Sequence, residues 1–148
     1  MTATTTFSTS TTAPTTAPEG RPATSTRAVC RTGAVAGLAA SVATSAFAAG
    51  AHALDVSLEV GGKAIPVLGF GQLTFVFSLI GALIAVVLSH RASRPRHTFV
   101  ITTLLLTALS TVPDVLADAQ TATRLTLTLT HVIAAAIVIP AISSRLTD

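Results

Sequence analysis

Long apolar runs free of Asp, Glu, Lys and Arg alternate along the chain with short segments that hold nearly all of its charges. About 20 apolar residues in a helix cross the roughly 30 Å hydrocarbon layer of a bilayer. Four runs reach or approach this length, which predicts an all-α membrane protein built as a four-transmembrane-helix bundle. We expect the helices at about 33–54, 67–89, 98–117 and 122–144.

The beginning of the chain differs from the rest. Residues 1–28 are mainly Thr, Ser, Pro and Ala, and Phe7 is their only aromatic side chain. Such a segment buries too little apolar area to offset the entropy lost on ordering. We therefore expect a disordered cytoplasmic tail over 1–28 and a membrane domain over 29–148.

The segment between the first two spans has the pattern of a β-hairpin. Val56, Leu58 and Val60 alternate with polar residues, and Gly61-Gly62 follows them. A Gly-Gly pair can adopt the positive φ values that a two-residue hairpin turn requires. We expect a short extracytoplasmic hairpin at about 55–66, lying against the ends of the helices because an isolated hairpin is marginally stable.

The first span is the least hydrophobic of the four and has two interpretations. It is a cleaved signal peptide if Arg27 and Arg31 act as the basic region before small-residue cleavage positions. It is a retained helix if its small residues, spaced every four positions, form a face for close helix packing. We favour the retained helix, whose packing residues are Gly33, Gly37, Ser41 and Ser45.

Basic residues are distributed unevenly between the two sides of a four-span topology. The side with the two termini and the middle connection holds seven Arg and Lys residues, and the other side holds two. The positive-inside rule then places both termini in the cytoplasm. Arg91, Arg94 and Arg96 form a compact group that can attract anionic lipid headgroups. The alternative, which we favour, is that these arginines only set the orientation.

Polar residues inside the third and fourth spans predict a polar seam between these two helices. His131 lies about two turns inside the fourth helix, and Arg124, Thr128 and His131 share one face of it. The third helix has a polar stripe that includes Thr107 and Asp114, with Asp118 beyond it. We expect Asp114 or Asp118 to pair with Arg124 near the outer surface, with His131 deeper.

Two roles are open for His131. An imidazole can take up and release protons near neutral pH, so His131 can relay protons or gate a small permeant. Alternatively, it bonds a Thr hydroxyl or a backbone carbonyl of the third helix and serves packing, which we favour.

Composition and motifs exclude several function classes. Only 10% of residues are charged, the net charge is +3, and the basic residues lie beside spans, so nucleic acid is not an expected partner. The expected partner is the lipid bilayer. The sequence has no phosphate-binding loop, no paired metal ligands and no nucleophile with a base, so we expect no enzyme activity, no metal and no cofactor. Cys30 is the only cysteine, so no internal disulfide can form.

The chain resembles a family of small, uncharacterised four-helix membrane proteins found chiefly in actinobacteria, a domain of unknown function. The resemblance covers about 27–145 and rests on the small-residue first helix, Gly61-Gly62, Pro113 and the stretch HVIAAAIVIP over 131–140. It implies a bacterial inner-membrane location and no established activity.

Two hypotheses about function follow. The first is a non-enzymatic structural or interaction component that associates with another membrane protein or with itself. The second is a small transport or proton-coupled component that uses His131, Asp114 and Arg124.

Overall fold

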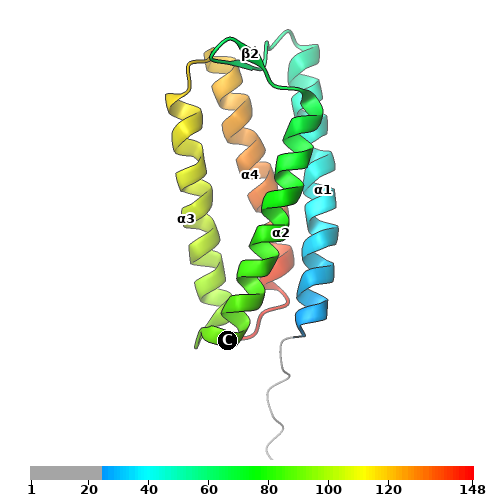
Figure 1. Ribbon diagram of the computed structural model, residues 1–148, viewed down its shortest axis with the longest axis vertical. Helices are drawn as coiled ribbons and strands as arrows, with labels where there is room; N and C mark the ends of the chain where they lie inside the picture. The colour runs from blue at the N-terminus through cyan, green and yellow to red at the C-terminus, as the bar shows by residue number, and fades with distance from the viewer. Residues whose placement is uncertain (1–24) are drawn as a thin grey trace, which may run out of the picture.

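The computed structural model describes residues 25–148; the first 24 residues, which the tail prediction mainly concerns, lie outside the described part. Four helices lie side by side, each antiparallel to the next along the chain (Figure 1). They are α1 (Thr26–Ala53), α2 (Val67–Arg91), α3 (Pro95–Leu116) and α4 (Thr121–Ser143). Each is long and apolar enough, by length and composition, to cross a membrane.

Two helices begin before the charge-free run that predicted them, for local reasons. α1 begins at Thr26, several residues before the expected 33, and the Ser25 hydroxyl accepts a hydrogen bond from the Ala28 N–H at 3.4 Å. α3 begins at Pro95 rather than 98, since proline is well suited to the first turn of a helix. Charge-free runs mark the part of a helix that suits hydrocarbon, and a helix can continue beyond it.

The connection from α1 to α2 contains a minimal antiparallel hairpin. Its strands are β1 (Glu59–Val60) and β2 (Lys63–Ala64), which are much shorter than the expected segment at 55–66. Gly61 and Gly62 form the turn with φ values of 57° and 71°. These left-handed values are the reason for glycine at both positions.

The hairpin is attached to the helices through a buried side chain and through a backbone bond, among other contacts. Leu58 is only 1% exposed and packs with Ala48 of α1 and Phe70 of α2, although its φ of 50° is unfavourable for a leucine. The Gly61 N–H donates to the Asp118 carbonyl at 2.9 Å, which ties the hairpin to the α3–α4 connection. We call this end of the bundle the hairpin end and the opposite end, where residues 25 and 148 lie, the terminal end.

The four helices are packed unequally. α1 lies between α2 and α4 and has its largest interface with α2, whereas α3 packs against α4 and to a lesser extent α2. The buried residues of α3 are only Pro95 and Phe99, both near the terminal end. Phe99 joins a core cluster with Val29 of α1 and Ile142 of α4. The rest of α3 is therefore held to the bundle by few apolar contacts.

Candidate functional site

The closest contact between an acidic and a basic side chain lies between α3 and α4. His131 Nδ1 is 2.9 Å from Asp114 Oδ2, the one such contact in residues 25–148, and it is an ion pair only when the imidazole is protonated. His131 lies about 15 Å along the axis of α4 from its first residue, at 1.5 Å per residue. The side chain of Asp114 is 12% exposed and that of His131 is 38% exposed. The carboxylate is thus largely buried, whereas the imidazole is partly open.

The hydrogen bonds of the imidazole leave one ring nitrogen free. Nδ1 also lies 3.0 Å from the Leu127 carbonyl, one turn earlier on α4. Both neighbours of Nδ1 accept hydrogen bonds, so we assign the proton of the neutral ring to Nδ1. Nε2 has no hydrogen-bond partner in the part of the chain that the structure describes. The ring therefore presents an open basic nitrogen.

The contact of His131 with Asp114 is electrostatic rather than a formed hydrogen bond. Although the two atoms are 2.9 Å apart, Asp114 Oδ2 is buried and has no hydrogen bond, because the ring is aligned with the Leu127 carbonyl instead. The carboxylate oxygen thus keeps an unfilled acceptor position beside the ring.

Two further polar atoms near the start of α4 are buried without partners. They are Thr123 Oγ1 and Arg124 Nε, and with Asp114 Oδ2 they are the three such side-chain atoms found within residues 25–148. Buried polar atoms are normally satisfied, so each exception calls for an explanation. All three lie in the hairpin-end half of the α3–α4 pair.

The expected pairing of Arg124 with Asp114 or Asp118 is wrong. Asp114 contacts His131, and Asp118 lies exposed in the connection after α3. Side chains on a helix tilt toward its N-terminus, so Asp114 tilts away from the hairpin end and His131 tilts toward it. In antiparallel helices these two side chains approach each other, and Asp114 does not tilt toward Arg124.

The hydroxyl groups in the polar stripe of α3 do not bond across the seam. Its hydroxyls donate to carbonyls of their own helix at 2.7 to 2.8 Å; they belong to Thr103, Thr107, Ser110 and Thr111. Thr128, the remaining seam residue, is half-buried on α4. The expected bond between His131 and a Thr hydroxyl or a carbonyl of the third helix is therefore not formed, because the carbonyl it contacts belongs to α4.

The small residues of α1 face α2 within the same chain. A Cβ placed on Gly33 would lie 2.5 Å from Ala82 Cβ, and one on Gly37 would lie 2.9 Å from Ser78 Cβ. Ser41 Oγ donates to the Gly71 carbonyl at 2.8 Å, and Gly71 also lies against Ser45. The two backbones approach closely because these side chains are small.

The basic residues between α2 and α3 are all exposed. Arg91 ends α2, Arg94 precedes α3 and Arg96 lies in its first turn. The Arg96 backbone N–H donates to Asp148 Oδ1 at 2.8 Å. This contact holds the end of the chain against the start of α3.

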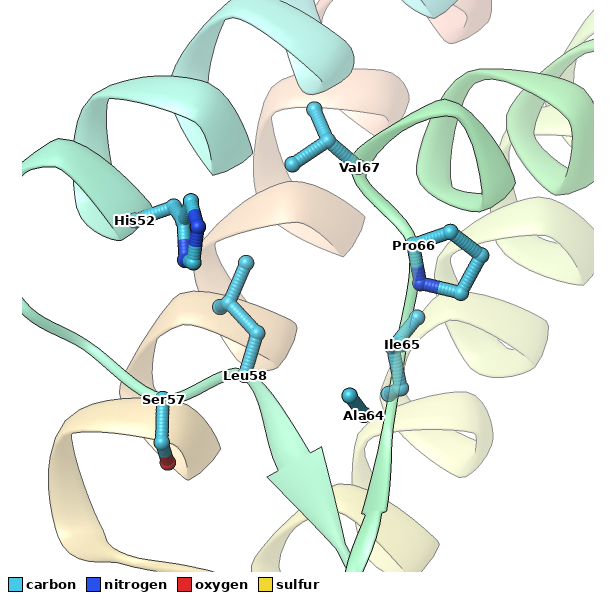
Figure 2. A pocket seen from close by; sticks show the side chains of 7 residues that line it. All are labelled: His52, Ser57, Leu58, Ala64, Ile65, Pro66 and Val67. Carbon is cyan, nitrogen blue, oxygen red and sulfur yellow. The ribbon is translucent and has the colours of Figure 1, made fainter.

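A cavity of about 280 Å³ lies under the hairpin, and the sequence did not indicate it. Figure 2 shows its walls: the His52 ring and Leu58 face the strand segment that leads into α2. The remaining wall residues are Ser57, Ala64, Ile65, Pro66 and Val67. With one imidazole and mostly apolar walls it has little chemistry to offer, and it is just below the usual size of a ligand pocket.

The part of the chain that the structure describes contains no group of three or more His, Cys, Asp or Glu side chains that could hold a metal ion. Cys30 is exposed near the start of α1.

A comparison with known protein families identifies the family of this chain. The model of a family of unknown function, DUF6069, matches residues 24–148, which is most of the sequence. The chain belongs to DUF6069. The match covers all four helices and the hairpin of this DUF6069 protein. No curated protein and no solved structure matches the chain.

Proposed function

We propose that this DUF6069 protein is a non-enzymatic, multi-pass protein of a bacterial inner membrane. The four long apolar helices support this, as do the many large apolar side chains that remain exposed, among them Leu105 at 66% and Leu109 at 65%. Such an apolar surface suits lipid far better than water. The segments between the helices are short, which leaves little chain for a separate catalytic domain.

We further propose that both termini are cytoplasmic and that α1 is retained. The terminal end carries most of the Arg residues, which supports the orientation by the positive-inside rule. Buried residues of α1, such as Ala40 and Thr44, pack inside the bundle, and cleavage would remove the helix between α2 and α4.

Labelling of single cysteines from outside the cell tests this topology. In a Cys30→Ser background, Gly62→Cys is expected to react with a membrane-impermeant maleimide, because it lies at the exposed turn of the hairpin. Ser93→Cys, exposed between α2 and α3, is expected to react only after the membrane is permeabilised. The opposite labelling pattern would refute the proposed orientation.

For the activity, we infer that the protein is a small proton-coupled or transport component whose working site is the His131–Asp114 pair. The observation that carries this is the contact of His131 with Asp114, whose Oδ2 is buried without a hydrogen-bond partner, between two apolar helices. Ionisable groups in hydrocarbon are energetically unfavourable, and in membrane proteins they commonly mark ion or proton paths.

The geometry suggests how a proton is held. Nε2 of His131 is the open nitrogen and takes up the proton, while Nδ1–H remains directed at the Leu127 carbonyl. The resulting imidazolium lies beside the Asp114 carboxylate, which offsets its charge. Release of the proton from Nε2 returns the ring to its neutral form.

A second candidate is the structural or interaction component. It is favoured by one observation: the buried residues of α3 are Pro95 and Phe99, both near the terminal end, and the His131–Asp114 contact links α3 to α4 nearer the hairpin end. The partner in that case is another membrane protein or a second copy of the chain, in contact with the exposed apolar surface.

Proton flux in liposomes separates the two candidates. Under an imposed pH gradient, liposomes with the parent protein are expected to transport protons, and His131→Ala is expected to abolish the flux while its melting temperature in detergent stays unchanged. His52→Ala is the matched control, because His52 is exposed at the hairpin end and should leave the flux intact. Flux that survives in His131→Ala would refute the proton-coupled role. A parent without flux, together with a less stable His131→Ala, would assign the pair to packing.

A further inference from the structure

A cleft at the terminal end brings together arginines that the sequence keeps far apart. It has a volume of about 250 Å³ and lies between the start of α1 and the end of α4. Its charged lining consists of Arg27, Arg31 and Arg145. Ser25 and Thr32 add two hydroxyl groups to the same walls. The cleft is therefore lined by hydrogen-bond donors with positive charge.

The charge in this cleft is not neutralised by the described part of the chain. None of the three arginines forms an ion pair within residues 25–148. The nearest acidic residue in sequence to Arg145 is Asp148, and its carboxylate instead accepts bonds from the backbone N–H groups of Arg96 and His97, at 2.8 and 3.3 Å. Three guanidinium groups thus share one cleft with no acidic side chain among its lining residues.

The parts of α1 and α4 beside the cleft are well packed against each other. Arg145 Nε donates to Thr32 Oγ1 at 3.1 Å, which links the end of α4 to α1. Val29 and Ile142, next to the lining residues along α1 and α4, are completely buried. The N-terminus of α1 adds partial positive charge at the same place. The guanidinium groups are consequently presented by two helices whose relative position is fixed.

The depth at which the cleft would lie in a membrane limits the chemical classes of ligand that it can bind. α1 has 28 residues and is about 42 Å long, longer than the roughly 30 Å of hydrocarbon. Its charge-free part begins after Arg31, so Arg27 and Arg31 lie outside it, and a helix longer than the hydrocarbon layer can carry them to the depth of the lipid phosphates. Arginine binds phosphate oxygens with two parallel N–H bonds, a geometry that lysine cannot reproduce.

We propose that this cleft binds the phosphate group of an anionic phospholipid. It is distinct from Arg91, Arg94 and Arg96, the group that the sequence suggested for lipid headgroups, since none of those residues lines the cleft. The binding site holds one lipid between α1 and α4 through charge and directed hydrogen bonds, and it is independent of the proton site at His131.

The test compares two triple variants of the full-length protein in nanodiscs. One replaces the cleft arginines 27, 31 and 145 by Gln; the matched control replaces arginines 91, 94 and 96, which removes the same charge at the same end. The melting temperature is measured in phosphatidylcholine discs with and without phosphatidylglycerol, and bound lipid is counted by native mass spectrometry. A third arm adds inorganic phosphate to discs of phosphatidylcholine alone.

We expect phosphatidylglycerol to raise the melting temperature of the parent and of the control, but not of the cleft variant. In detergent, each cleft arginine replaced by Gln is expected to weaken binding of short-chain phosphatidylglycerol about fivefold. Arg145→Lys should also weaken binding, because it keeps the charge but lacks the planar guanidinium that binds two phosphate oxygens at once. An equal loss in both triple variants would refute a specific site, and so would a parent that does not respond to phosphatidylglycerol. Stabilisation by inorganic phosphate as large as that by the lipid would refute the lipid assignment.

Discussion

The close approach of α1 and α2 makes Gly33→Ala the sharpest test of the packing. The added Cβ would lie 2.5 Å from Ala82 Cβ and 3.7 Å from Ala82 Cα. Two carbon atoms attract best at about 3.5 to 4.0 Å, so the contact is too short by roughly 1 Å. Ala82 has no rotatable side chain that can move aside, and it is only 4% exposed. The two helices must therefore separate locally.

The size of the effect follows from two opposing terms. Overpacking a tight interface destabilises by about 1 to 3 kcal/mol. Alanine favours the helix over glycine by about 1 kcal/mol, which offsets part of this. The net expectation is a loss of up to about 2 kcal/mol in the free energy of unfolding. SDS titration of the protein in mixed micelles, followed by circular dichroism, measures it.

A matched substitution isolates the clash from the change in helix propensity. Gly81→Ala makes the same change inside α2, where a new Cβ meets nothing within 4 Å. It should be neutral or stabilising by up to about 1 kcal/mol. In addition, Ala82→Gly in the Gly33→Ala background removes the clashing atom and should restore the lost stability. A Gly33→Ala protein as stable as Gly81→Ala, or one that Ala82→Gly does not rescue, would refute the packing argument.

Two other substitutions are expected to change the same unfolding free energy. Ser41→Ala removes the hydrogen bond to the Gly71 carbonyl between α1 and α2 and should lower stability by about 0.6 kcal/mol. Its control, Ser89→Ala, removes a bond within α2 and should have almost no effect. Equal losses in the two variants would contradict this. Leu58→Ala should lower the free energy of unfolding by about 2 to 4 kcal/mol, because Leu58 is 1% exposed. Leu54→Ala should not lower it, because Leu54 is 80% exposed. A tolerated Leu58→Ala would mean that this side chain does not anchor the hairpin.

The helices and the hairpin turn could be predicted because their causes are local. Apolar runs located all four helices, and Gly61-Gly62 located the turn, since positive φ values favour glycine. The positive φ of Asp55 belongs to the C-terminal cap of α1, where the Asp55 and Val56 N–H groups donate to the His52 and Ala51 carbonyls. The positive φ of Leu58 had no such local cause. Leu58 adopts its conformation because its side chain is buried among the helix ends, and that depends on the whole fold.

The candidate sites were harder to predict, because they depend on how side chains are directed. The spacing of polar residues correctly put Asp114 and His131 on the third and fourth helices. It wrongly paired Asp114 or Asp118 with Arg124, because spacing alone ignores the tilt of side chains toward the helix N-terminus. The arginine cleft was missed for another reason. Thr32 and Arg145 are 113 positions apart, and only the packing of α1 on α4 brings them into contact.

The unequal packing of the helices has a consequence for how the sequence can change over evolutionary time. Leu104, Leu105 and Leu109 of α3 are more than half exposed, so each requires only an apolar side chain and can drift among Leu, Ile, Val and Phe. Gly33 and Gly37 of α1 have no such freedom, because any larger side chain would meet α2. Among related sequences, we therefore expect α3 to conserve its mean hydropathy but not its amino-acid identities, and α1 to conserve both its hydropathy and its amino-acid identities.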